Sequence, residues 1–232
     1  MLLFKVFPEN ISTYGNEIDN LFWLIFAISA VAFIVSLFVL LYPLYSNHHS
    51  KKKKADYITG EKKSHFKWVA IAVVIMALSD FAIMFAEHGT WAKIEEDPVS
   101  VDFHIAVTGR QWNWIFTYPG KDGILYTADD ITIDDQNSEL HVPVNKNIVF
   151  DLKSRDVVHS FFLKNIRLKQ DAVPGRTIKR WFNCIKEGKY EIACSEICGV
   201  LHSQMRNWLV VDSQENFDNY INALYNQNQP KK

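Results

Sequence analysis

KYEIACSEICGVLHSQMRNWLVVD, residues 189–212, places two segments of alternating apolar residues on either side of a cluster of soft metal ligands. Alternation in KYEIAC and NWLVVD predicts two β-strands, because successive side chains of a strand face opposite ways. Cys194, Cys198 and His202 recur at intervals of four, as on one face of a helix, but Gly199 and the flanking strands argue against a helix. The stretch therefore predicts a loop between two strands that carries these three ligands and Met205.

Segments with the same alternation continue on the N-terminal side of this stretch. VDFHIAVTG places every second residue from Val101 on one face, and QWNWIFTYPG alternates likewise before a Pro-Gly turn. ELHVPV, NIVFDLKS and RTIKRWFN add further short strands with turns between them. This run of strands predicts a small β-sandwich or barrel over residues 101–212.

The tail, residues 213–232, changes to a helical pattern. Ser213 is a suitable N-cap. Four apolar residues follow at helical spacing: Phe217, Tyr220, Ile221 and Leu224. We expect a C-terminal helix that packs on the strands and ends in a frayed tail.

The ligand types in the loop indicate copper. Thiolate, imidazole and thioether ligands together favour copper, and a thioether disfavours zinc. Two thiolates can each bridge two copper ions, and a pair that shares one electron needs little rearrangement, which suits electron transfer. Structural zinc is the main alternative metal, but its usual finger spacings differ from the C-x3-C-x3-H-x2-M pattern found here.

A second imidazole is needed to make such a copper pair symmetrical. The candidates are His88, His104, His141 and His159. His159, in DVVHSFF, follows a predicted strand and could reach the loop, and spacing alone does not exclude His141. The third cysteine, Cys184 in RWFNCIKEG, is interpreted as a buried strand residue without a redox role.

Two long apolar runs precede the strands. Residues 21–45 contain no charged residue and residues 68–86 contain only Asp80. Each run can cross most or all of a hydrocarbon core of roughly 30 Å, so both predict transmembrane helices rather than buried core helices. A cleaved signal peptide is the alternative for the first run, but the run is too long and its N-terminal flank is mainly acidic. We therefore expect it to be a retained anchor.

Lysines predict the topology of these helices. The loop of residues 46–67 holds seven lysines against two acidic residues, which places it on the cytoplasmic side. The alternative for the lysines is a patch that binds nucleic acid or lipid headgroups. Residues 1–20 and the strand domain then lie outside, joined to the second helix by a polar linker at residues 87–100. The formal net charge of -1 indicates no particular partner.

Three motifs in order resemble subunit II of the haem–copper cytochrome c oxidases. CSEICGVLHSQM is similar to the family's binuclear copper (CuA) motif, DVVHSFFLKNIRLKQDAVPGR to the block that carries its first histidine, and GRQWNWIFTYP to its aromatic stretch. The resemblance covers nearly the whole chain. It implies a membrane-anchored all-β protein, with two N-terminal transmembrane helices followed by a cupredoxin-like Greek-key β-sandwich.

The resemblance also implies roles for individual residues. Cys194 and Cys198 would be bridging thiolates, His159 and His202 terminal imidazoles, and Met205 a weak ligand. Glu196 would coordinate through its backbone carbonyl, with its carboxylate toward a magnesium ion shared with subunit I. Trp112 would be the point where the electron enters. The remaining aromatic patch would comprise Gln111, Trp114, Phe116 and Tyr118.

The function that follows from the resemblance is electron input. The chain would accept electrons one at a time from cytochrome c at the CuA centre and pass them to the haems of subunit I, where oxygen is reduced to water. Its partners would be subunit I, other oxidase subunits, cytochrome c and membrane lipid, but not nucleic acid. We expect a two-pass protein of the bacterial inner membrane with the copper domain on the periplasmic side. The alternatives are a quinol oxidase subunit II without copper, a membrane-anchored copper chaperone and a tethered interaction module.

Charged residues outside the ligand set carry three further hypotheses. Asp80 lies deep enough in the second apolar run to need a partner or water, and we expect it to face subunit I. Glu61 and His65 stand where some members carry a proton-uptake glutamate, and the resemblance assigns that role to neither. The acidic insert 122–135 could steer a basic cytochrome c, with a solvated loop or a Ca²⁺-binding turn as alternatives.

Overall fold

The computed structural model describes residues 7–48, 50, 59–96, 98 and 100–227, which fall into two compact units. One unit comprises the two long helices, from Glu17 to Lys93. The other comprises the N-terminal segment up to Asn16 and everything from Ile94 onward. Lysines 51–54 of the expected cytoplasmic loop lie outside the described residues.

The first unit is formed by helices α1 (Gly15–Ser46) and α2 (Lys63–Glu95). Both are long and apolar enough to cross a membrane. Each extends beyond the apolar run that predicted it, and α2 takes in much of the stretch that we expected to be a linker. Helix formation continues there because HGTWAKIE contains no proline before Pro98.

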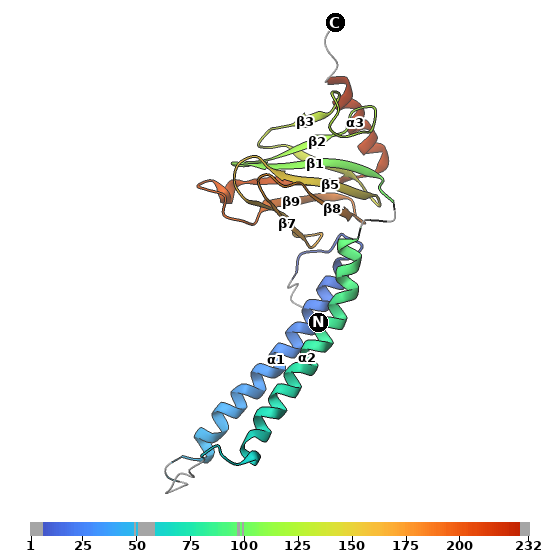
Figure 1. Cartoon of the computed structure of the whole chain (residues 1–232). Helices are drawn as coiled ribbons and strands as arrows, with labels where there is room; N and C mark the ends of the chain where they lie inside the picture. The colour runs from blue at the N-terminus through green and yellow to red at the C-terminus, as the bar shows by residue number, and fades with distance from the viewer. Residues whose placement is uncertain (1–6, 49, 51–58, 97, 99, 228–232) are drawn as a thin grey trace. The chain divides into compact units, whose positions relative to one another are not determined.

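The second unit is a β-sandwich of two five-stranded sheets, and Figure 1 shows strands of this unit. The first sheet contains, in spatial order, β3 (Ile131–Ile133), β2 (Asn113–Tyr118), β1 (Phe103–Arg110), β5 (Asn147–Ser154) and β8 (Ile178–Asn183). The second contains β4 (Glu139–Pro143), β10 (Arg206–Asp212), β9 (Gly188–Cys194), β6 (His159–Leu163) and β7 (Leu168–Ala172). The predicted β-sandwich is confirmed.

The sheets are mostly antiparallel, but β1 pairs in parallel with β5 and β4 in parallel with β10. These neighbours are distant in sequence, so the connections cross between sheets, as in Greek-key sandwiches. Strands β3, β6 and β7 were not predicted, because the acidic insert, HSFFL and the KNIRLKQDA region show no clear apolar alternation. His159, expected just after a strand, is instead the first residue of β6.

Aromatic side chains from both sheets fill the core. Phe161 of β6 meets Trp114 of β2 at a ring distance of 5.0 Å and Phe150 of β5 at 5.6 Å. Phe150 also contacts Phe182 of β8 at 5.8 Å. All four side chains are fully buried. This core holds the two sheets together beside the strand ends that carry the predicted ligands.

The segment before α1 is part of the sandwich. The Ile11 amide donates to the Asn165 carbonyl at 2.9 Å, and the Ile185 amide donates to the Ile11 carbonyl at 2.8 Å. Ile11 is fully buried, and Tyr14 packs edge-on against Trp181. The N-terminal segment therefore adds apolar contacts and backbone pairing to the domain that follows α2.

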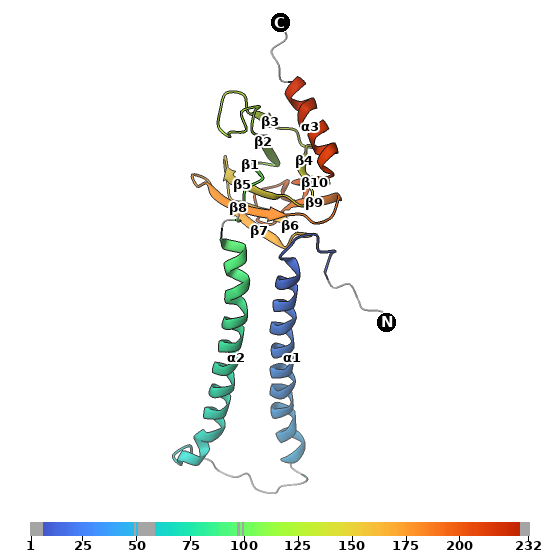
Figure 2. The same ribbon diagram turned by 90° about the vertical axis from the view of Figure 1, so that its right-hand side faces the viewer.

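The C-terminal helix α3 (Gln214–Gln227) lies beside β4 and β10, as Figure 2 shows. The Ser213 hydroxyl accepts a hydrogen bond from the Asn216 amide at 3.3 Å, which is the predicted N-cap contact. Phe217 and Ile221 are buried against the sandwich. The helical spacing read from the sequence thus marks the face that packs.

Candidate metal centre

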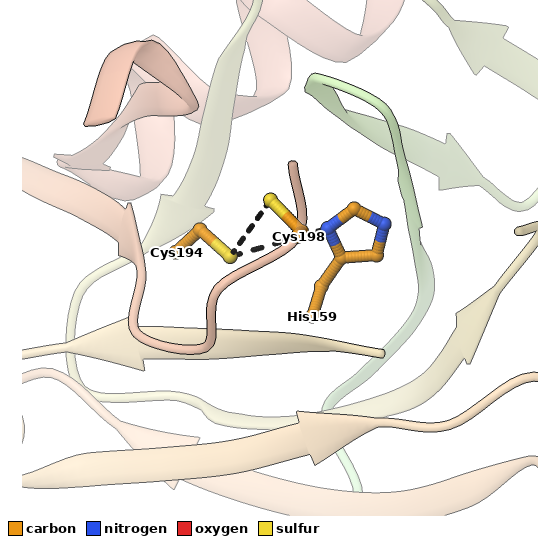
Figure 3. Close-up of side chains that lie close together, drawn as sticks. All are labelled: His159, Cys194 and Cys198. Atoms are coloured by element: carbon orange, nitrogen blue, oxygen red, sulfur yellow. Dashed lines mark hydrogen bonds between the residues drawn. The ribbon is translucent and has the colours of Figure 1, made fainter. Parts of the chain in front are cut away.

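The predicted ligands gather at one end of the sandwich, where two paired strands and one loop meet. Cys194 is the last residue of β9, and His159 is the first residue of the adjacent strand β6. The Ser195 amide donates to the Ser160 carbonyl at 2.9 Å, which holds the start of the ligand loop against β6. Figure 3 shows His159, Cys194 and Cys198 pointing toward one another.

The sulfur atoms form the centre of the cluster. Cys194 Sγ and Cys198 Sγ lie 3.8 Å apart, and His159 Nδ1 lies 4.0 Å from Cys194 Sγ. The three ligand atoms lie within 4.8 Å of one another. Ligands that share one metal ion at about 2.0–2.3 Å are at most about 4.6 Å apart, so this spacing is close to that of a metal site.

Three more donor groups flank the sulfur atoms. His202 Nδ1 and Met205 Sδ lie 3.5 Å and 3.8 Å from Cys198 Sγ. The Glu196 carbonyl accepts a hydrogen bond from the Cys194 thiol at 3.2 Å, while the Glu196 side chain is exposed. All six predicted ligand residues are therefore together, with Glu196 presenting its backbone oxygen.

The two thiols differ in acidity. Burial raises the pKa of Cys194, but hydrogen bonds from the His159 ring and from backbone groups outweigh it and lower the pKa to about 6. Burial, and then the negative charge of Cys194, raise the pKa of Cys198 to about 12. Metal ligation requires thiolates, so binding releases the proton that Cys198 retains.

Asp156 supports the His159 ring from the side opposite the sulfur atoms. Asp156 Oδ1 lies 2.8 Å from His159 Nε2, and Asp156 Oδ2 accepts a hydrogen bond from the Gln111 amide at 2.7 Å. Gln111 Nε2 in turn donates to the Cys198 carbonyl at 2.7 Å. Since Nε2 of His159 is engaged, Nδ1 is left to face the metal position. Asp156 was not predicted from the sequence, where its signal is a carboxylate three residues before a ligand histidine.

Trp112 lies against the ligand loop. A Cβ added at Gly199, whose φ is +129°, would meet Trp112 Nε1 at 3.0 Å and Gln111 Nε2 at 2.9 Å. Glycine permits both this backbone conformation and this close approach. Gly199 directly follows Cys198, so the half-buried indole of Trp112 packs on the residue next to a predicted ligand.

Of the other predicted members of the aromatic patch, Gln111 is exposed and the three aromatic residues belong to the core. Trp114, Phe116 and Tyr118 are fully buried, so they do not form a surface with Trp112. Trp114 packs edge-on against the His159 ring with the centroids 5.9 Å apart. Its role here is to shape the pocket around a ligand rather than to contact a partner protein.

The histidines that the sequence had left as alternatives are elsewhere. His141 Nδ1 lies 2.7 Å from Asp212 Oδ2, and the ring stacks on Tyr220 of α3. His104 faces Asp151 at 3.2 Å, and His88 belongs to α2. The sandwich therefore brings only His159 of these candidates to the cysteines. Cys184 is fully buried outside the cluster, and burial raises its pKa to about 12.

The donor set fits a copper pair. Two thiols at bridging distance, an imidazole beside each and a thioether form a soft set, and these ligand types favour copper over zinc. All three cysteines are free, so no disulfide competes for the thiols. A single closed zinc site would use four ligands, whereas six donor groups meet here.

Comparisons with known proteins point to one family. The family described as "Cytochrome C oxidase subunit II, periplasmic domain" matches residues 103–213. The alternative cytochrome c oxidase subunit 2 of Bradyrhizobium diazoefficiens is 27% identical over 91% of this chain and 81% of its own length. Cytochrome c oxidase subunit 2 of Thermostichus vulcanus is 38% identical over 58% of this chain, which spans only 37% of that protein.

A solved structure is also similar. The periplasmic domain of subunit II of cytochrome oxidase from Bradyrhizobium japonicum is 31% identical, with a TM-score of 0.49, over 55% of this chain and 96% of that domain. The family match covers the sandwich, and the 27% identical relative is similar over 91% of this chain. This chain belongs to the cytochrome c oxidase subunit II family.

Proposed function

We propose that this chain is the electron-input subunit of a membrane-bound terminal oxidase. It accepts single electrons from cytochrome c at a binuclear copper centre and passes them to the haems of subunit I, where oxygen is reduced to water. The observation that carries the proposal is the pair of buried thiols 3.8 Å apart, each flanked by an imidazole nitrogen.

Each ligand residue has a distinct task in this proposal. Cys194 and Cys198 would hold the copper ions through their thiolates, His159 and His202 would hold them through imidazole nitrogens, and Met205 and the Glu196 carbonyl would be weaker donors. The chemistry that a bound copper pair supplies is one-electron acceptance and release, with the electron shared by both ions. The paired strands β6 and β9 hold donors at fixed positions, which limits rearrangement when the charge changes.

Trp112 is the proposed point of electron input. Its indole packs on Gly199, and its neighbour Gln111 is hydrogen-bonded to the Cys198 carbonyl. An electron that reaches the indole edge is therefore next to a proposed bridging ligand. Trp112→Phe should slow reduction by cytochrome c without changing the copper content. An unchanged reduction rate would remove Trp112 from this role.

We propose that the sandwich lies on the periplasmic side of a bacterial inner membrane. Residues before α1 pack against the sandwich that follows α2. The start of α1 and the end of α2 are therefore on the same side of the membrane. Such a pair crosses the membrane twice, and the lysine-rich loop between the helices supports a cytoplasmic position for their other ends. The exposed Glu196 side chain is then available for magnesium at a contact with subunit I.

Metal analysis of the purified chain tests the copper centre. We expect two copper ions per chain and the hyperfine pattern of one electron shared by two copper nuclei. Cys198→Ser should abolish that pattern, whereas Cys184→Ser, the matched control outside the cluster, should keep it. One copper ion, or zinc, in the wild-type chain would refute the proposal.

A further inference from the structure

Gly109 occupies a position in β1 where the sequence pattern calls for a buried apolar side chain. The residues four and two positions before it, Ile105 and Val107, are fully buried, and residues at this spacing share one face of a strand. A glycine inside a strand has no side chain to pack, and it often marks the close approach of another group. The group that approaches Gly109 comes from the opposite sheet of the sandwich.

The His159 ring fills the space beside Gly109. A Cβ added at position 109 would lie 2.9 Å from Cδ2 and 3.1 Å from Cγ of His159. It would also lie 3.1 Å from Cζ3 of Trp114, the residue that pairs with Gly109 in the neighbouring strand β2. Carbon atoms in contact prefer separations of about 3.5–4.0 Å, so even a methyl group does not fit here.

The surroundings of the His159 ring resist its displacement. Trp114 packs edge-on against the ring, with the centroids 5.9 Å apart. Asp156 Oδ1 lies 2.8 Å from Nε2, the ring atom bonded to Cδ2. Cγ is joined through Cβ to the backbone of β6, which pairs with β7 and β9. A Cβ at position 109 would therefore push the ring by about 0.6 Å against these contacts.

We propose that Gly109 is a positioning residue of the metal centre: the absence of a side chain leaves the space in which the His159 ring turns Nδ1 toward Cys194. His159 Nδ1 lies 4.0 Å from Cys194 Sγ in this orientation. Functional sites need their ligands held within about 0.5 Å of the productive geometry, which is about the displacement that a Cβ would cause. The inference rests on the proposed function in that His159 is a copper ligand.

Thermal unfolding of the full chain in detergent, without copper, tests the contact between Gly109 and His159. Gly109→Ala should lower the unfolding midpoint by about 2–12 °C, because overpacking a buried position destabilises the fold. In the background of His159→Ala, which removes the ring, Gly109→Ala should not lower the midpoint further. An equal loss in both backgrounds would overturn the proposal.

A matched control and a second variant keep this test decisive. Gly89→Ala is the control, because a Cβ at Gly89 would meet no described atom within 4 Å, and it should leave the midpoint no lower than that of the wild type. Where Gly109→Ala alone does not fold, adding His159→Ala should restore folding. A double variant that still fails to fold, although His159→Ala alone folds, would contradict the proposal.

Copper binding by the full chain tests the consequence for the ligand. Gly109→Ala should weaken copper affinity by about 10–100-fold in chelator competition, as the loss of a ligand's support typically does, and should alter the copper hyperfine pattern. Wild-type affinity with an unchanged pattern would overturn the proposal. The copper count of the wild-type chain separates the two ideas. Absence of a copper pair there would refute the proposed function, whereas the unfolding results decide the contact between Gly109 and His159 without copper.

Discussion

Replacing Asp156 by alanine should weaken copper binding without removing any ligand. Asp156 Oδ1 lies 2.8 Å from His159 Nε2, and its other oxygen accepts from the Gln111 amide at 2.7 Å. Burial alone would raise the pKa of Asp156, but hydrogen bonds from Gln111 and His159 outweigh it and hold the pKa below its usual value. The carboxylate is therefore ionised at neutral pH, where both bonds are charge-assisted.

The magnitude follows from what each bond does. The bond to His159 orients a ligand ring, and loss of such a support typically lowers metal affinity by about 10–100-fold. That range corresponds to about 1.4–2.7 kcal/mol. The bond to Gln111 holds the turn that carries Trp112, so its loss should also loosen the contact with Gly199. We therefore expect a weaker copper site and slower reduction by cytochrome c in the same variant.

Chelator competition on the full chain in detergent measures the copper affinity of Asp156→Ala. Asp218→Ala is the matched control, because it removes an exposed carboxylate on α3, a helix that carries none of the proposed ligands. Thermal unfolding of both variants establishes that the sandwich is intact. Equal copper affinities in the two variants would show that Asp156 does not support His159.

Three further changes test other parts of the structure. Ile11→Ala should lower the free energy of unfolding by about 2–5 kcal/mol at an unchanged copper content, and wild-type stability would contradict the packing of the N-terminal segment. Glu191→Gln should cost up to about 1 kcal/mol at pH 7. The hydrogen bond from Lys164 is the main cause of the lowered pKa of Glu191. The stabilisation by ionised Glu191 is therefore present above pH about 4.3 and is lost as the pH falls through the lower pKa of the folded state. The unfolding curves of the wild type and Glu191→Gln should converge only in acid. Asp122→Asn with Asp135→Asn should slow association with a basic cytochrome c at low salt and flatten its salt dependence, and an unchanged low-salt rate would exclude steering.

The acidic insert shows how tertiary contacts limit an interpretation made from charge alone. The Asp134 carboxylate lies 2.8 Å from the Arg110 guanidinium, and the Asp130 carboxylate accepts a hydrogen bond from the Tyr126 amide at 2.6 Å. These carboxylates are partly engaged within the domain, so fewer of them are free to act on a partner. The sequence shows their number but not this pairing, because Arg110 precedes the insert on another strand.

The sequence by itself determined the features that depend on neighbouring residues. Uninterrupted apolar runs predicted two long helices, since most of the surface of a membrane helix meets hydrocarbon. Alternation predicted strands on both sides of the ligand loop, and the close spacing of Cys194, Cys198, His202 and Met205 predicted a soft metal site within one segment. Strands with weak alternation, including β6, were not predicted from the sequence. Burial on both faces of a strand, or exposure on both faces, removes the alternation of apolar and polar residues.

Only the tertiary structure decided the features that join distant parts of the chain. It brought His159, and not His141, to cysteines 35 and 39 residues further on, because β6 pairs with β9 whereas β4 pairs with β10. It placed Trp112 on the ligand loop and left Trp114 in the core. It also docked the segment before α1 onto the sandwich. Such contacts depend on the order of strands in the sheets and on packing across the core. Local periodicity along the chain predicts neither of these.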